Sequence, residues 1–177
     1  MANFQAFTGI VTLIEDFWTG DSGETGCYKL ISVEDSTGSL VNFVVTPATY
    51  FVDRAILAVG DMVTGFYDAD APVPLIFPPQ YRAVVMAKVT PYQNVKVDYF
   101  DEELVSSDGM LKLNIAPSTQ IMLENGQCFT GSLANRYLIV VYGPTTRSIP
   151  AQTTPYQIIV LCWRNVAPKP DTKTGAG

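Results

Sequence analysis

The chain has 177 residues, of which 47% are hydrophobic and 16% charged, and this composition supports a folded core and excludes a disordered chain. The net charge is −6 at pH 7 and the 11 lysines and arginines are scattered singly, so a nucleic-acid partner is disfavoured. The sequence has no histidine, which excludes nucleophiles activated by an imidazole base, and it predicts no enzyme, no metal site and no cofactor.

The first part of the chain, residues 1–90, reads as strands interrupted by one short helix. Residues 16–26 form a polar, glycine-rich loop, and residues 72–79 form a proline-rich crossing. Thr46 and Pro47 carry the signature of a helix start, which predicts a short helix over residues 47–57. Three strands, a helix and two strands are the element order of an OB-fold. The predicted strands cover residues 4–17, 27–33, 40–45, 62–67 and 81–89.

The second part, residues 91–165, predicts a related β unit. It restarts near Asn94, turns at residues 107–109, and carries a tight Asn-Gly hairpin signal at residues 125–126. The segment 130–135 is too short for a helix, so this unit is expected to be an open or degenerate copy. Residues 166–177 have almost no apolar content and are expected to form a flexible tail. The predicted fold class is therefore all-β, with two tandem OB-like β-barrel units, the second one degenerate.

An internal repeat supports the two-unit arrangement. Residues 67–87 align without a gap against residues 142–162, and both segments read as strand, proline-rich loop and strand. The alignment pairs Tyr67 with Tyr142 and Tyr81 with Tyr156. A shared structural role is the simpler interpretation of these four tyrosines.

The closing segment of this repeat also carries a family resemblance. YGPTTRSIPAQTTPYQIIVL, which starts at Tyr142, resembles small β-rich modules that accompany copper amine oxidase N-terminal-like stalk domains in surface proteins of Gram-positive bacteria. The resemblance covers about twenty residues in each copy. It implies a non-enzymatic surface module, and none of its residues is a copper ligand. The chain differs from those modules because its first residues carry no readable export signal.

Location and cysteine chemistry follow from the same features. Without an export signal or a membrane span, the chain is expected to be cytoplasmic by default, with release to the cell or spore surface as the alternative. Cys27 and Cys128 lie beside predicted turns, where reduced thiols are expected and an intermolecular disulfide is the alternative. Cys162 ends an apolar run and is expected in the core.

Aromatic residues around the glycine-rich loop are the candidate ligand site, because OB-folds bind single strands or sugars by stacking them on exposed rings. The simpler interpretation is that these rings fill the barrel or close its mouth. The acidic clusters around Asp68 and Asp101 read as solvated turns rather than catalytic pairs. The candidate binding residues are Phe17, Trp18, Tyr28, Lys29 and Arg82.

Two functional hypotheses remain open at this stage. The first is a non-enzymatic structural or scaffolding protein that associates with itself into an oligomer or a fibre, through strand edges left unpaired by an incomplete second barrel. The alternative is an OB-type binding module for a single nucleic-acid strand, an oligosaccharide or a peptide.

Overall fold

The computed structural model describes residues 2–162, which form an all-β protein, as the sequence predicts. Within this range the helical segments are two 3-10 turns, η1 (Ser22–Glu24) and η2 (Val52–Arg54). The strands fall into two compact units that divide between Val97 and Asp98, and each unit has its own buried core. The tail predicted for residues 166–177 lies outside the described residues.

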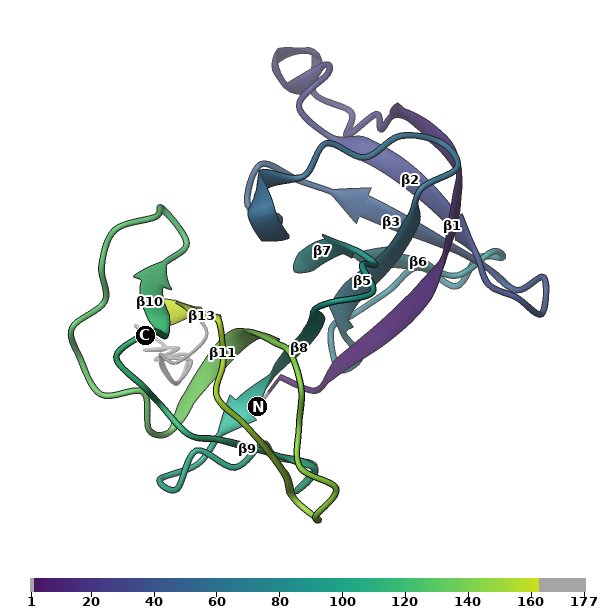
Figure 1. The fold of residues 1–177 in the computed structure, drawn as a ribbon. Coiled ribbons are helices and arrows are strands. Elements are labelled where there is room, and N and C mark those ends of the chain that lie inside the picture. Colours follow the sequence, from purple (N-terminus) through teal and green to yellow (C-terminus); the bar gives the residue numbers. More distant parts are fainter. Residues whose placement is uncertain (1, 163–177) are drawn as a thin grey trace, which may run out of the picture. The chain divides into compact units, whose positions relative to one another are not determined.

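Unit 1 contains one seven-stranded sheet in the order β4-β7-β5-β1-β2-β3-β6 (Figure 1). The long strand β1 pairs with β5 along its first half and with β2 along its second half. The strands are β1 (Phe4–Asp16), β2 (Lys29–Glu34), β3 (Leu40–Val45), β4 (Tyr50–Phe51), β5 (Met62–Asp68), β6 (Gln80–Arg82) and β7 (Val85–Lys88).

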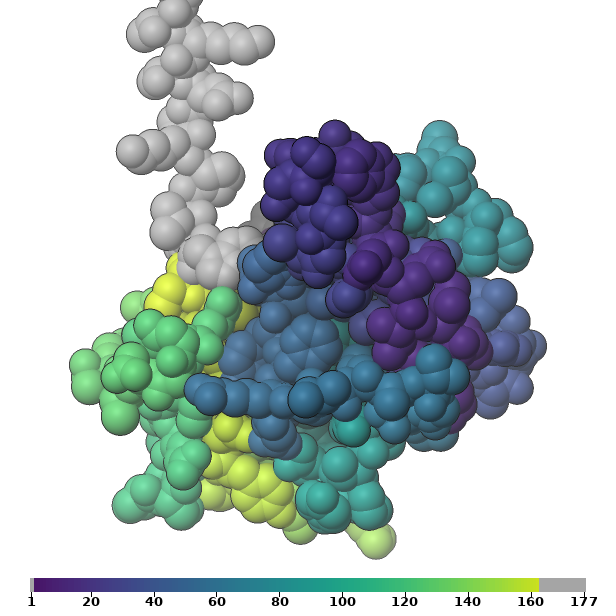
Figure 2. All heavy atoms as spheres, turned by 90° about the horizontal axis from the view of Figure 1, so that it is seen from above, coloured from purple at the N-terminus to yellow at the C-terminus, as the bar shows by residue number. Residues whose placement is uncertain are grey.

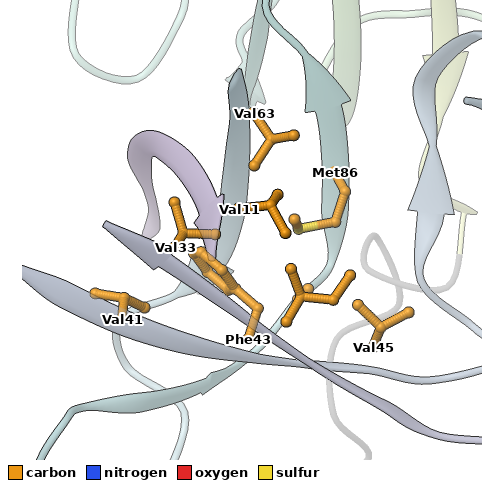
Figure 3. Packing of buried hydrophobic residues seen from close by; sticks show 9 residues of the cluster. Val11, Val33, Val41, Phe43, Val45, Val63 and Met86 are labelled. Carbon is orange, nitrogen blue, oxygen red and sulfur yellow. The ribbon is translucent and has the colours of Figure 1, made fainter. Parts of the chain in front are cut away.

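The two ends of this sheet are joined by the link between β6 and β7. Ala83 N donates to Val44 O of β3, and Val84 N donates to Phe66 O of β5, at 3.0 and 2.8 Å. The sheet therefore curls around a single core. Figure 3 shows that core, in which the aromatic ring of the fully buried Phe43 lies among branched aliphatic side chains.

Unit 2 has a four-stranded sheet in the order β10-β13-β11-β8 and a two-stranded sheet of β12 and β9. Two isolated bridges, Phe100 with Ser106 and Val105 with Lys112, stand where unit 1 has the full strand β2. The strands are β8 (Asn94–Phe100), β9 (Leu111–Leu113), β10 (Gln120–Leu123), β11 (Arg136–Tyr142), β12 (Ala151–Thr153) and β13 (Gln157–Val160).

The two units share one pairing pattern. In unit 1, β3 is parallel to β6, β4 is parallel to β7, and β5 is antiparallel to β7. In unit 2, β9 is parallel to β12, β10 is parallel to β13, and β11 is antiparallel to β13. Strands β3 to β7 therefore correspond to strands β9 to β13, taken in order.

One threonine hydrogen bond, repeated in both units, fixes the register of this correspondence. Thr49 Oγ1 donates to Ala83 O, and Thr119 Oγ1 donates to Pro155 O, each at 2.8 Å. Each threonine hydroxyl also accepts from the backbone N–H three residues earlier. Thr119 therefore stands at the position of Thr49, and Pro155 stands at the position of Ala83.

This register corrects the gapless alignment at its second tyrosine. Tyr156 stands at the position of Val84, since the backbone N–H of each donates at 2.8 Å to the equivalent carbonyl of β5 or β11. These carbonyls belong to Phe66 and Val141. Tyr67 and Tyr142 are the next residues along the chain, so the first tyrosine pair of the alignment does match. Tyr156 is not the equivalent of Tyr81, because the connection before it is shorter in unit 2 and the alignment needs a gap there.

The helix predicted over residues 47–57 is wrong. Thr46 does cap a turn, in which its side chain accepts from Ala48 N and its carbonyl accepts from Thr49 N. The chain then extends into β4 and makes the single turn η2, where Asp53 has a left-handed backbone with φ 58°. The Thr-Pro signal therefore starts a tight turn, and the hydrogen bonds of Tyr50 go to the sheet instead of a helix.

No helix among residues 2–162 is long and apolar enough to cross a membrane.

Candidate functional site

A cleft of about 410 Å³ opens on unit 1 between two loops. One loop joins β1 to β2 and supplies an aromatic wall. The other, residues 69–79, joins β5 to β6 and supplies a wall that contains Pro72, Val73 and Pro74. Val44 of β3 and Arg82 of β6 lie between these walls.

The aromatic wall is held by the first hydrogen bond of a hairpin. Phe17 follows the last residue of β1 and Tyr28 precedes the first residue of β2, and Phe17 N donates to Tyr28 O at 2.9 Å. Between them the loop folds back through η1, where Asp21 caps the turn by accepting from Gly23 N. Trp18 follows Phe17 on this loop and is 63% exposed. The cleft therefore has a large indole surface open to solvent.

The structure brings four of the five candidate binding residues together in this cleft: Phe17, Trp18, Tyr28 and Arg82. Lys29 is not among the lining residues, because its ammonium group forms an ion pair with Asp16 across the β1–β2 hairpin. The alternation of side chains along a strand explains this result, since Lys29 follows Tyr28 and points to the other face of the sheet.

Two charged groups beside the cleft act on the Tyr28 phenol. A hydrogen bond to the Glu24 carboxylate, together with the negative charge of that carboxylate, raises the pKa of Tyr28. The nearby Arg82 guanidinium opposes this shift. Tyr28 is therefore neutral at physiological pH, and its ring presents an uncharged face beside a single cation.

The sequence does not predict the proline wall of the cleft. The proline content of residues 72–79 indicates a crossing between strands, yet three of these residues line the cleft. No local signal marks this wall, because strand pairing between segments far apart in the sequence places the β5–β6 loop beside the β1–β2 loop. Gln80, at the start of β6, is a further lining residue that nothing in the local sequence distinguishes.

The four repeat tyrosines have different surroundings. The rings of Tyr67 and Tyr81 stack at 3.9 Å between centroids with an interplanar angle of 11°. Burial, and then the neighbouring Tyr81, raise the pKa of Tyr67. Tyr142 packs against the core of unit 2, whereas Tyr156 is half exposed and lies against Gly143. The stacked pair belongs to the core edge of unit 1 and has no counterpart between Tyr142 and Tyr156, since the latter has the position of Val84.

All three cysteines are free and exposed: Cys27, Cys128 and Cys162. The expectation that Cys162 belongs to the core is wrong, because β13 ends at Val160 and Leu161 is the last buried residue of this segment.

The acidic clusters hold their own turns together. Asp101 Oδ1 accepts from Glu103 N at 2.9 Å and from Val105 N at 3.0 Å. Asp68 Oδ1 accepts from Asn3 N and Asp70 N, each at 3.0 Å. Among residues 2–162 there is no group of three or more Cys, Asp or Glu side chains that could hold a metal ion. These carboxylates serve as caps of backbone N–H groups.

No protein-family model, curated protein or solved structure matches this chain.

Proposed function

We propose that unit 1 is a non-enzymatic binding module that holds an extended peptide in its cleft, and that both units are OB-like barrels, the second one reduced. Support for the barrels comes from the strand order. With β6 and β7 counted as one bent strand, unit 1 follows the path β1-β2-β3-(β6, β7)-β5 and returns to β1. This order agrees with the one expected of the five-stranded, partly open barrel of an OB-fold, and it supports the proposal.

The position of the cleft carries the proposal. OB-folds take their ligands on the face of the second and third strands, between the loop after strand one and the loop between strands four and five. The cleft has these same walls, with Trp18 and Tyr28 on the first loop and Pro74 on the second. A volume of about 410 Å³ falls within the range of roughly 300–1,000 Å³ that is usual for ligand clefts.

The lining favours a peptide over a nucleic acid or a sugar. Arg82 is the only cation among the lining residues of this cleft, and the Glu24 carboxylate, which is hydrogen-bonded to Tyr28, carries a negative charge near Arg82. The cleft therefore offers little positive charge for binding phosphates. Most of the lining residues are aromatic, aliphatic or proline, which leaves few groups for the hydroxyls of a sugar. Aromatic-lined grooves with a few polar groups are the usual receptors of extended, proline-rich segments.

Tryptophan fluorescence tests this proposal. The chain has two tryptophans, so a Trp163→Phe chain reports from Trp18 alone. We expect saturable quenching with synthetic decapeptides that carry a Pro-x-x-Pro core, and we expect Tyr28→Ser to raise the dissociation constant about tenfold or more. Tyr92→Ser is the matched control, because Tyr92 is an exposed tyrosine of unit 1 that does not line the cleft. Saturation by cello-oligosaccharides or oligothymidine, with no response to the peptides, would contradict the peptide assignment.

A second candidate is the structural, self-associating role. One observation favours it: the loop between β5 and β6 carries three consecutive exposed apolar side chains, Leu75, Ile76 and Phe77. Soluble monomers seldom expose such a run, because burying apolar surface against a partner lowers the free energy.

A further inference from the structure

The 72–79 loop is the most exposed apolar segment of unit 1. Leu75 and Phe77 are 101% and 89% exposed, and Ile76 between them is more than half exposed. In Figure 2 the segment around residue 75, coloured teal, projects beside the purple segment that follows β1. Prolines at positions 72, 74, 78 and 79 restrict the backbone of this loop. Docking it onto a partner therefore costs little conformational entropy.

The exposed area matches one half of a stable interface. Together with Trp18 and Val73, these three residues expose a total area on the order of 700 Å², main chain included, since a large aromatic residue alone covers roughly 150–250 Å². The largest apolar patch of an ordinary monomer is about 300–600 Å². A standard protein interface buries about 800 Å² on each partner. The patch is therefore close to the size of one side of a dimer contact.

The projecting loop and the cleft belong to the same patch. Pro72, Val73 and Pro74 line the cleft, and Leu75 to Phe77 follow them directly and turn outward into solvent. The loop forms a wall of its own cleft, so its outward tip is available to the cleft of another molecule. A two-fold interface uses the same patch on both subunits, so a patch with both a projection and a hollow lets each copy supply the projection for the other's hollow.

We infer that the tip of this loop in one copy, Leu75 to Phe77, occupies the cleft of a second copy, and that the reciprocal contact closes a two-fold dimer. This inference rests on the proposed peptide-binding function and names the peptide: a proline-flanked apolar loop of the same protein. A cavity of about 150 Å³ holds a benzene ring, so a cleft of about 410 Å³ has room for the ring of Phe77 and the side chain of Leu75.

The equivalent loop of unit 2 lacks the exposed apolar run. In the register set by Thr49 and Thr119, Ile149 stands at the position of Phe77, and it is 82% exposed. The residues before it, Thr145, Thr146, Arg147 and Ser148, are polar, so unit 2 does not repeat the apolar run of residues 75–77. Each chain then offers one such loop, and reciprocal insertion about a two-fold axis closes a pair.

A lipid bilayer is the less favoured occupant of the loop. The net charge of −6 opposes approach to an anionic membrane, and the 11 basic residues are scattered singly. The cleft beside the loop is also a feature that insertion into lipid would not require.

Mixing two defective variants tests the inference. The loop variant carries Leu75→Ser and Phe77→Ser, and the cleft variant carries Trp18→Ser. Because all three cysteines are exposed, mass is measured by sedimentation velocity in reductant across a concentration series. We expect a concentration-dependent dimer for the wild type, and a dimer dissociation constant raised about 100-fold or more in either variant. An equimolar mixture should form dimers again, because the heterodimer keeps one intact contact between a loop and a cleft.

Ile149→Ser is the matched control, since it removes an equally exposed apolar side chain from the equivalent loop and should dimerise like the wild type. All the substituted side chains are solvent-exposed, and unchanged thermal unfolding of the variants verifies that they fold. A mixture that stays monomeric would overturn the pairing of loop with cleft. A wild type that stays monomeric to millimolar concentration would overturn the dimer, whereas saturable binding of Pro-x-x-Pro peptides to that monomer would leave the proposed function standing. Binding of the wild type, but not the loop variant, to phosphatidylcholine and phosphatidylserine vesicles would assign the loop to lipid and overturn the inference.

Discussion

Replacing Gly65 with valine should lower the free energy of unfolding of unit 1 by about 3 kcal/mol, and adding Phe43→Leu to the same chain should recover more than half of that loss. A Cβ atom at Gly65 would lie 2.4, 2.6 and 2.8 Å from three carbons of the Phe43 ring. The ring has no room to move, because Phe43 is fully buried among the valines of Figure 3. Overpacking of this kind typically costs about 1–3 kcal/mol.

Unit 2 shows why the second substitution should compensate. In the shared register, Leu113 stands at the position of Phe43, and Val140 stands at the position of Gly65. Both residues belong to the buried core of unit 2. Unit 1 therefore packs the large ring of Phe43 against a glycine, whereas unit 2 packs two side chains of medium size, Leu113 and Val140, at the same two positions. The double variant gives unit 1 the pair that unit 2 already packs.

The measurement is thermal unfolding of the full chain followed by Trp18 fluorescence in a Trp163→Phe background, so that unit 1 is observed. For a unit of this size the loss in the Gly65→Val chain corresponds to a fall of about 10–20 °C in Tm. Phe43→Leu alone is the control and should cost less than the glycine substitution. If the two substitutions were simply additive, the assumed equivalence of the two cores would be wrong.

The all-β class and the aromatic wall of the cleft could be predicted because both depend on local patterns. Alternating apolar residues mark β1, and a glycine-rich loop between Trp18 and Tyr28 brings those rings to one end of a hairpin. The proline wall could not be predicted in this way. It meets the aromatic wall only because β5 and β6 place their connecting loop beside the β1–β2 loop, and that contact depends on long-range strand pairing.

Two other expectations failed because one local signal suits two structures. Thr46-Pro47 begins helices and tight turns equally well, and the choice was made by Tyr50, whose backbone pairs with β7. The repeat showed its similarity through Tyr81 and Tyr156, but hydrogen bonds between strands, which the sequence does not display, place Tyr156 at Val84. Identity of residue type was a weaker guide than the position of Thr49 and Thr119 in their turns.

Removing the hydroxyl of Thr49 should be the most damaging polar substitution in unit 1. Thr49 Oγ1 accepts from Thr46 N at 3.0 Å and donates to Ala83 O at 2.8 Å, and Thr46 and Ala83 are both buried. Valine keeps the shape of threonine but leaves one buried donor and one buried acceptor without that partner. Each unsatisfied group costs about 1–3 kcal/mol, so Thr49→Val should lower the free energy of unfolding by about 3 kcal/mol.

The same substitution in unit 2 is the matched comparison. Thr119 Oγ1 donates to Pro155 O at the same 2.8 Å, but Ala116 N approaches the hydroxyl only to 3.5 Å, so Thr119→Val should cost less, about 2 kcal/mol. Hydrogen exchange of the backbone amides in β5 and in β11 measures the two units separately. Thr49→Ser, which keeps the hydroxyl, should retain most of the stability. A Thr49→Val chain as stable as the wild type would show that the hydroxyl does not hold this junction.

The Thr49 bond also connects stability to the cleft. Ala83 follows Arg82, which lines the cleft, and Thr46, whose backbone N–H donates to Thr49 Oγ1, lines it as well. Loss of the hydroxyl should therefore loosen the cleft as well as the core. In the Trp163→Phe background, Thr49→Val should weaken binding of a Pro-x-x-Pro peptide even at temperatures where the chain remains folded. Thr119→Val, which changes the equivalent junction of the other unit, should leave that binding unchanged. Equal loss of binding in both variants would mean that the effect reflects general destabilisation and not the junction beside the cleft.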